Sequence, residues 1–178
     1  MKFVINPKYF QLAILLVIVI TIFLSILNVF QIPDALGNEK MMKHVMKSFG
    51  GSARNLVLLA IGYWIMKKVL TWSVQKKVPF IPTIRNLLLS LRKFHVTVGV
   101  VAFLLAIVHS AYFLYVFIFI KREDLFTNFT GMTSFIFLLL LVVFGVILWM
   151  KKKGASRKKH LQFSLIFFGF FLIHWLLS

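Results

Sequence analysis

Four of the five histidines in this chain form two pairs with the same spacing. His95 and His109 are 14 residues apart in one apolar segment, and His160 and His174 are 14 residues apart in another. On a helix of about 3.6 residues per turn, this spacing returns a side chain to within roughly 40° of its starting face, about 21 Å further along the axis. Each segment would therefore present two imidazoles on one face, one toward each edge of a hydrocarbon core about 30 Å thick. Two such helices side by side predict two stacked bis-histidine sites, which is the geometry of two haems placed across a membrane.

The composition indicates an integral membrane protein. The chain of 178 residues is 61% hydrophobic and has a mean hydropathy of +0.94, which is typical of a membrane domain rather than a soluble globule. It contains no cysteine, which excludes disulfides, thiolate-ligated haem, iron–sulfur clusters and c-type haem attachment. The net charge of +17 does not indicate nucleic-acid binding. Lysine and arginine lie between the apolar runs, where they set topology and contact anionic lipid headgroups.

Five apolar stretches are each close to the length of about 20 residues that a spanning helix needs. They are residues 10–30, 56–72, 94–120, 134–150 and 161–177. The sequence therefore predicts an all-α integral membrane protein, a bundle of about five transmembrane helices that forms a single haem-binding domain over residues 1–178. The cell membrane is the expected location.

The distribution of basic residues predicts the orientation of this bundle. If the N-terminus is inside, the inner segments are 1–9, 67–93 and 151–159. These segments hold 15 of the 21 lysines and arginines, and the outer segments hold the other six and all four acidic residues. Because cytoplasmic loops carry an excess of Lys and Arg, we expect the N-terminus inside and the C-terminus outside.

Two shorter segments outside the spans also have readable patterns. The stretch 39–49 alternates apolar and basic residues, which suits a short amphipathic helix at the membrane interface. Pro79 and Pro82 break the chain in the second inner segment. From Thr83 a helix could run along the membrane surface or straight into the third span.

The histidine face of the third span is lined by small residues. Steps of 4, 7 and 11 residues from His95 reach Gly99, Ala102 and Ala106, before His109 completes the row. A flat macrocycle needs room against a helix backbone, and these residues would supply it. Small residues also let spanning helices approach one another closely, so helix packing is the competing explanation.

The equivalent face of the fifth span is aromatic. Ser164, Phe167 and Phe171 occupy the same offsets between His160 and His174. Phe167 is near the midpoint, where it could fill the gap between two haems. Because the chain has 21 phenylalanines, one at this position is unremarkable, and ordinary packing is the simpler explanation.

The histidines fit haem better than a bare metal ion. Ionisable groups within a span are costly and therefore suggest function. Two histidines about 21 Å apart on one helix cannot bind one ion, and no carboxylate lies within a predicted span to complete a site. The third and fifth spans run in the same direction, which pairs His95 with His160 at an inner haem b and His109 with His174 at an outer one.

Two further polar residues are assigned from their positions. Arg92 lies one turn before His95 and is the best candidate to pair with a haem propionate, although positive-inside topology also explains its charge. His44 has no partner in the outer segment, and we interpret it as an ordinary surface residue.

The two histidine segments resemble the ferric-reductase-like transmembrane domain family. This family includes ferric reductases, NADPH oxidases and the membrane subunit of bacterial methionine sulfoxide reductase systems. The resemblance rests on RKFHVTVGVVAFLLAIVHS and KKHLQFSLIFFGFFLIHW, each with the H-x13-H spacing, and on the single span between them. It covers roughly residues 50–178. It implies two b haems held by His95, His109, His160 and His174, and electron transfer across the membrane.

The chain also departs from many members of that family. They have six spans and a fused cytosolic flavin and nicotinamide domain, whereas this chain has five apparent spans and no G-x-G-x-x-G fingerprint. It resembles the stand-alone versions, which include small bacterial cytochromes that work beside extracytoplasmic flavoproteins. We expect that it cannot oxidise NAD(P)H unaided.

Three functions are compatible with these patterns. The first is a transmembrane electron-transfer subunit that passes electrons from a cytoplasmic flavoprotein or a membrane quinol to an extracytoplasmic acceptor. The second is a non-redox protein that handles or senses haem. The third is a cationic structural or assembly subunit without a cofactor. A purified protein without a Soret band would eliminate the first two.

Overall fold

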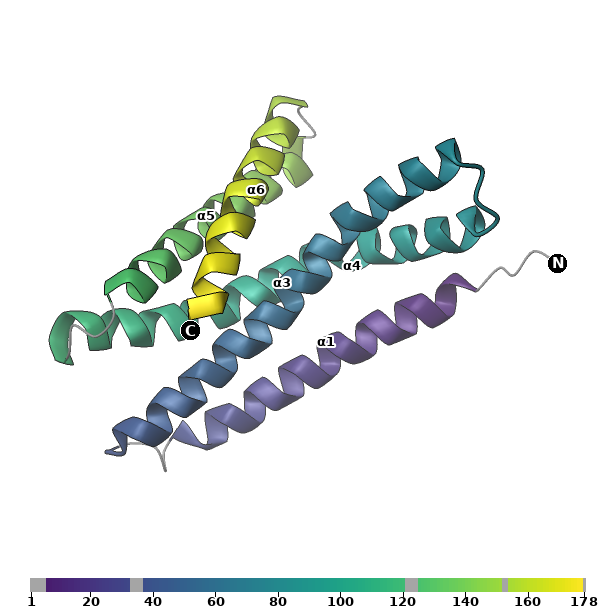
Figure 1. Ribbon diagram of the computed structural model, residues 1–178. Helices are drawn as coiled ribbons and strands as arrows, with labels where there is room; N and C mark the ends of the chain where they lie inside the picture. The colour runs from purple at the N-terminus through teal and green to yellow at the C-terminus, as the bar shows by residue number, and fades with distance from the viewer. Residues whose placement is uncertain (1–5, 33–36, 121–124, 152–153, 178) are drawn as a thin grey trace. The chain divides into compact units, whose positions relative to one another are not determined.

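The computed structural model describes residues 6–32, 37–120, 125–151 and 154–177, without the side chains of residues 149, 151 and 154–157. These residues form helices and short turns, and no strand occurs among them. In chain order the helices are α1 (Pro7–Phe30), α3 (Glu39–Gln75), α4 (Ile81–Tyr115), the π-helical segment η1 (Val116–Ile120), α5 (Leu125–Lys151) and α6 (Gly154–Leu177) (Figure 1). When α4 and η1 are counted as one helix, these are five helices, and each is long and apolar enough to cross a membrane. Each predicted span lies within an observed helix, so the prediction of an all-helical fold with five such helices is confirmed.

Asparagine caps set the starts of the first two helices. The side-chain oxygen of Asn6 accepts a hydrogen bond from the Lys8 backbone N–H at 3.0 Å, and Pro7 follows in the first turn of α1. Asn38 caps α3 in the same way, accepting from the Met41 N–H at 3.1 Å. Each cap satisfies a backbone donor that the helix itself leaves unpaired, and proline is tolerated in the first turn for the same reason.

The prediction of a short separate helix over residues 39–49 is wrong. These residues form the first turns of α3, which continues without a break for 37 residues to Gln75. At about 1.5 Å per residue α3 is roughly 55 Å long, well beyond a 30 Å hydrocarbon core. Val45, Met46 and Phe49 are buried in the protein. The apolar face of this stretch is therefore covered by protein, which the sequence pattern could not distinguish from an interfacial face.

A tight turn connects α3 to α4. Lys77 has a left-handed φ of 52°, the Val78 N–H bonds to the Ser73 carbonyl at 3.0 Å, and the Lys77 N–H bonds to the Val74 carbonyl at 3.2 Å. This is the Schellman arrangement that commonly ends helices. α4 then begins at Ile81 and runs without interruption through the third span, so the alternative of a separate surface helix after Thr83 is excluded.

The chain divides into two units, residues 1–102 and 103–178. In the first unit α1 packs against α3, and the Asn28 amide donates a hydrogen bond to the Ser48 hydroxyl at 2.7 Å. At the other end of α1, the Lys93 ammonium on α4 donates to the Gln11 side-chain oxygen at 3.3 Å. The start of α1 therefore lies beside α4 close to the α3–α4 turn, and its end lies beside the first turns of α3.

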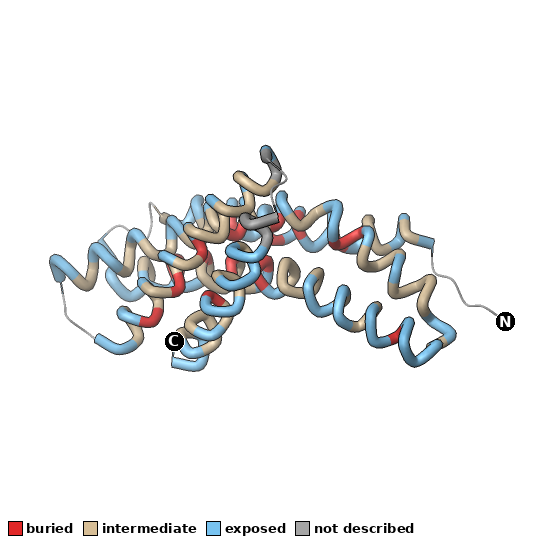
Figure 2. Tube along the Cα trace, turned by 90° about the horizontal axis from the view of Figure 1, so that it is seen from above, coloured by how far each residue is buried: buried red, intermediate tan, exposed pale blue. Residues whose placement is uncertain are grey.

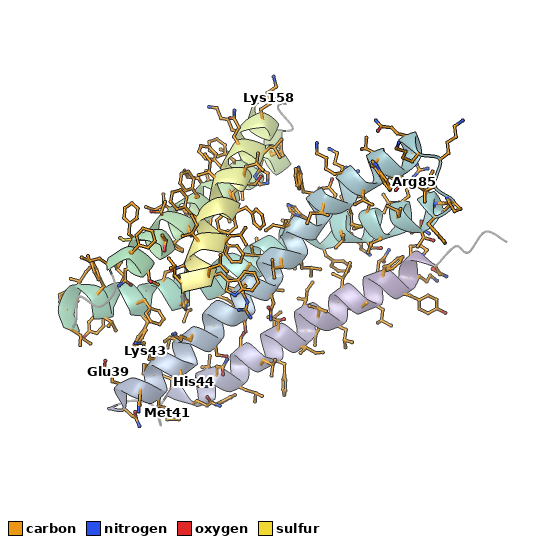
Figure 3. All side chains as sticks on the ribbon, viewed as in Figure 1. Glu39, Met41, Lys43, His44, Arg85 and Lys158 are labelled. Atoms are coloured by element: carbon orange, nitrogen blue, oxygen red, sulfur yellow. The ribbon has the colours of Figure 1, made fainter. Side chains whose placement is uncertain are left out.

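Charged residues mark both ends of the first unit. Figure 3 shows Arg85 beside the α3–α4 turn, and Glu39, Lys43 and His44 at the opposite end of α3. Arg85 and His44 are both exposed. An exposed His44 agrees with the prediction that it is an ordinary surface residue.

The second unit is built on the antiparallel hairpin of α5 and α6. Aromatic rings join the two helices along their length. Phe137 lies 6.1 Å from Phe163 and 6.0 Å from Phe170 between ring centroids, and Phe144 lies 5.1 Å from Phe163. Pairs at these separations contribute about 0.5–1.5 kcal/mol beyond their buried area. They fix the register in which α6 presents its histidines to α5.

Much of the surface of every helix is exposed and apolar. Figure 2 shows few buried positions on each helix and long exposed stretches between them. Leu16, Phe23 and Phe30 on α1 are exposed to 57%, 58% and 71%. Such a surface is unfavourable in water, but in a bilayer the lipid tails cover it, and the helices satisfy their own backbone hydrogen bonds.

The Asn28–Ser48 contact gives a test of how α1 and α3 associate. Replacing either residue by alanine removes a polar bond between two apolar helices. We expect each single variant to lower the free energy of unfolding by about 0.6 kcal/mol and by no more than about 1.7 kcal/mol. A double-mutant cycle in detergent micelles measures the coupling. Independent effects of the two substitutions would show that the contact does not contribute.

Candidate functional site

The second unit brings His109 of α4 and His174 of α6 together. Their ring centroids lie 6.5 Å apart, with the ring planes at 69°, and both side chains are half-buried. Two imidazoles that bind opposite sides of one metal, with bonds of about 2.0–2.1 Å, have centroids roughly 6 Å apart. The structure therefore holds the two rings at close to the separation of a shared axial pair.

A backbone carbonyl of α5 holds the ring of His174. The Nδ1 atom of His174 lies 3.2 Å from the Thr127 carbonyl oxygen. Because a carbonyl can only accept, Nδ1 carries the hydrogen, and Nε2 keeps the lone pair that can bind a metal. A hydrogen bond of this kind orients most metal-binding histidines and increases their basicity.

Two glycines on α5 lie against the histidines of α6. Gly131 faces the ring of His174, and Gly145 faces the ring of His160. Sequence reasoning missed Thr127 and both glycines. A usable pattern existed for the glycines, because Gly131 and Gly145 are 14 residues apart, the spacing of the histidines that they face. No sequence pattern identifies Thr127, which contributes only its backbone.

His160 is half-buried near the start of α6. Its Nδ1 atom is buried and has no hydrogen bond of regular geometry with the residues that the structure describes, although the Leu141 backbone is close enough to interact with the ring. The contact with Leu141 is therefore weak, because a hydrogen bond weakens steeply when its angle is poor. A buried ring nitrogen without a partner is costly on an apolar helix, and such atoms often mark binding sites.

His95 lies in the first unit, where its ring centroid is 5.2 Å from that of Tyr63 on α3. His95 is half-buried, and Arg92 is exposed on the same helix. His160 belongs to the second unit, so the pairing of His95 with His160 stays a prediction. The pairing of Arg92 with a propionate is also a prediction.

The small residues of α4 occupy different environments. Ala102 is buried, with 1% of its surface exposed, whereas Gly99 and Ala106 are half-buried. A Cβ built at Gly99 would meet no described atom within 4 Å. No described neighbour therefore requires glycine at this position, and a role of Gly99 in leaving room for a flat group stays a prediction.

Phe167 is buried on α6, with 5% of its surface exposed. It stacks on Phe171 at 5.6 Å between ring centroids, and it is seven residues from both His160 and His174. Buried Leu138 is likewise seven residues from Gly131 and from Gly145. Phe167 thus lies midway along the hairpin. This position is compatible both with ordinary packing and with a spacer role.

The described part of the chain contains no cluster of three or more His, Cys, Asp or Glu side chains that could hold a metal ion by itself. A six-coordinate haem needs only two axial side chains, since the porphyrin supplies the other four ligands. The bis-histidine arrangement, the fixed tautomer of His174 and the small residues beside the rings all fit such a group.

The chain was compared with protein-family models, with curated proteins and with solved structures, and no match was found in any of the three.

Proposed function

We propose that the chain is a transmembrane cytochrome b that carries electrons through two bis-histidine haems to an extracytoplasmic acceptor, as in the ferric-reductase-like family. The observation that supports this most directly is the His109–His174 pair, with rings 6.5 Å apart and His174 fixed by a backbone carbonyl. In this proposal His109 and His174 would hold the outer haem b, and His95 and His160 would hold the inner haem b.

The residues of the chain perform binding and positioning in this proposal. Haem b supplies one-electron transfer and, with two axial histidines, has no open iron position. His109 and His174 offer imidazole nitrogens at one level of the membrane. α4 is continuous from His95 to His109, so its two histidines are separated by about 21 Å along the axis. The apolar helices exclude water from both levels.

The donor and the acceptor lie on opposite sides of the membrane in this scheme. A flavoprotein on the cytoplasmic side, or a quinol within the bilayer, reduces the inner site. His109 and His174 would occupy both open positions of the outer haem iron, so an extracytoplasmic acceptor would receive electrons without binding the iron. Anionic lipid headgroups contact the basic residues at the cytoplasmic ends of the helices.

The optical spectrum of the purified protein tests this function. We expect a Soret band, a sharp α band after reduction with dithionite, and about two haems per chain. A preparation without a Soret band would refute the proposal. Rapid transfer of haem to apomyoglobin would instead favour the haem-handling alternative, because an electron carrier must retain its cofactor.

Reporter fusions test the orientation. We expect a fusion at Gly154 to report the cytoplasm and a fusion at Asn128 to report the outside, because 15 of 21 basic residues fall in the proposed inner segments. Residues 121–124 and 152–153, which carry part of this charge, lie outside the described residues. Opposite labelling of the two fusions would reverse the proposed direction of electron flow.

A further inference from the structure

The two glycines of α5 contact the histidines of α6 at different distances. A Cβ at Gly131 would lie 2.8 Å from Cε1 and 3.1 Å from Nδ1 of His174. A Cβ at Gly145 would lie 3.5 Å from Cε1 and 3.8 Å from Nδ1 of His160. The first contact is too short for any side chain, whereas the second is an ordinary van der Waals contact. Only at Gly131 would an added Cβ therefore force the ring that it faces to shift.

A side chain added at Gly131 would meet the ring of His174 first. A glycine between two helices usually permits the backbones to approach one another. The three atoms nearest to a Cβ at Gly131 all belong to the ring of His174, and none belongs to the backbone of α6. The missing side chain thus accommodates this one imidazole.

The position of the ring has a chemical consequence. The Thr127 carbonyl, one turn before Gly131, accepts the Nδ1–H of His174 at 3.2 Å and also a hydrogen bond from the Thr130 hydroxyl at 3.0 Å. A ring pushed away from α5 would lose its bond to this carbonyl. The ring could then turn, and either nitrogen could carry the hydrogen.

We propose that Gly131 is a positioning residue for the outer haem ligand. By carrying no side chain, it lets His174 lie against α5, where the Thr127 carbonyl fixes the hydrogen on Nδ1 and leaves Nε2 to bind iron. This inference rests on the proposed haem function. The hydrogen bond makes the imidazole a stronger donor, which stabilises oxidised iron and lowers the potential of the outer haem.

Substitution of the glycines by alanine tests the inference. We expect Gly131→Ala to weaken binding of the outer haem by about 10–100-fold, the usual effect of losing such a hydrogen bond. We also expect the potential of the outer haem that remains bound to rise. Gly145→Ala should leave the outer haem unchanged. Gly169→Ala is the matched control, because a Cβ at this exposed position of α6 meets no described atom within 4 Å.

Three readouts distinguish positioning from general damage. They are the haem-to-protein ratio, a redox titration that resolves the two haems, and the helical content by circular dichroism. Wild-type occupancy and potential in Gly131→Ala would overturn the proposal, and so would equal loss of both haems. If the wild-type protein itself contains no haem, the proposed function fails; if it contains two and Gly131→Ala behaves identically, only the positioning role fails.

A double variant covers the case in which Gly131→Ala does not accumulate. In Gly131→Ala/His174→Ala the ring that would clash is absent. Recovery of accumulation in the double variant would show that the ring contact caused the failure, as proposed. If the double variant also fails while His174→Ala alone accumulates, glycine is needed by the backbone and the inference is wrong.

Discussion

We expect the replacement of His174 by alanine to remove the proposed outer haem and to lower the haem content from about two per chain to about one. The iron of a six-coordinate haem loses one of its two protein ligands, and His109 alone must hold it. We expect the same loss for His109→Ala, because the two rings lie 6.5 Å apart at one level. His95→Ala and His160→Ala should instead remove the inner haem. The pyridine haemochrome assay and a redox titration measure both effects.

His44→Ala provides the control for these variants. His44 is exposed near the start of α3, and it should keep both haems at wild-type potentials. Loss of all haem from any one of the four histidine variants would contradict two separable sites. A wild-type content near one haem per chain would contradict the same prediction.

We expect the purified chain to be reduced by dithionite but not by NADH or NADPH. The described residues contain no strand, so they hold no strand–turn–helix unit that could bind a dinucleotide. Most of the predicted inner segment 67–93 is helical, and only residues 76–80 lie between α3 and α4. Stopped-flow absorbance of the haem bands measures the rates. Fast reduction of the purified chain by NADH alone would contradict this prediction.

The response to salt distinguishes the two proposed donors. We expect a flavoprotein to dock on exposed basic residues such as Arg85, which Figure 3 shows at the α3–α4 turn. High ionic strength screens such contacts and would slow reduction in membranes. Reduction by a quinol analogue should be insensitive to salt, because the quinol reaches the site through the bilayer. If haem reduction in membranes is equally fast at low and high salt, the result would argue for the quinol route.

The helices themselves could be predicted well from the sequence. Each of the five apolar stretches lies within an observed helix, because a span needs about 20 apolar residues whatever its neighbours are. The ends were harder to predict. α3 begins at Glu39, 17 residues before the predicted span 56–72, because hydropathy measures contact with lipid and does not register a helix that continues beyond the membrane.

The sequence by itself determined which residues could do chemistry. The 14-residue spacing of His160 and His174 is read from the sequence, and helix geometry alone then places both side chains on one face. Tertiary structure decided what each ring meets. The register of the α5–α6 hairpin places Gly131 and the Thr127 carbonyl against His174, and the part of α4 that belongs to the second unit brings His109 beside the same ring. These contacts join residues 43 to 65 positions apart in the chain. They depend on which helix faces pack together, and periodicity within one helix carries no information about its partner.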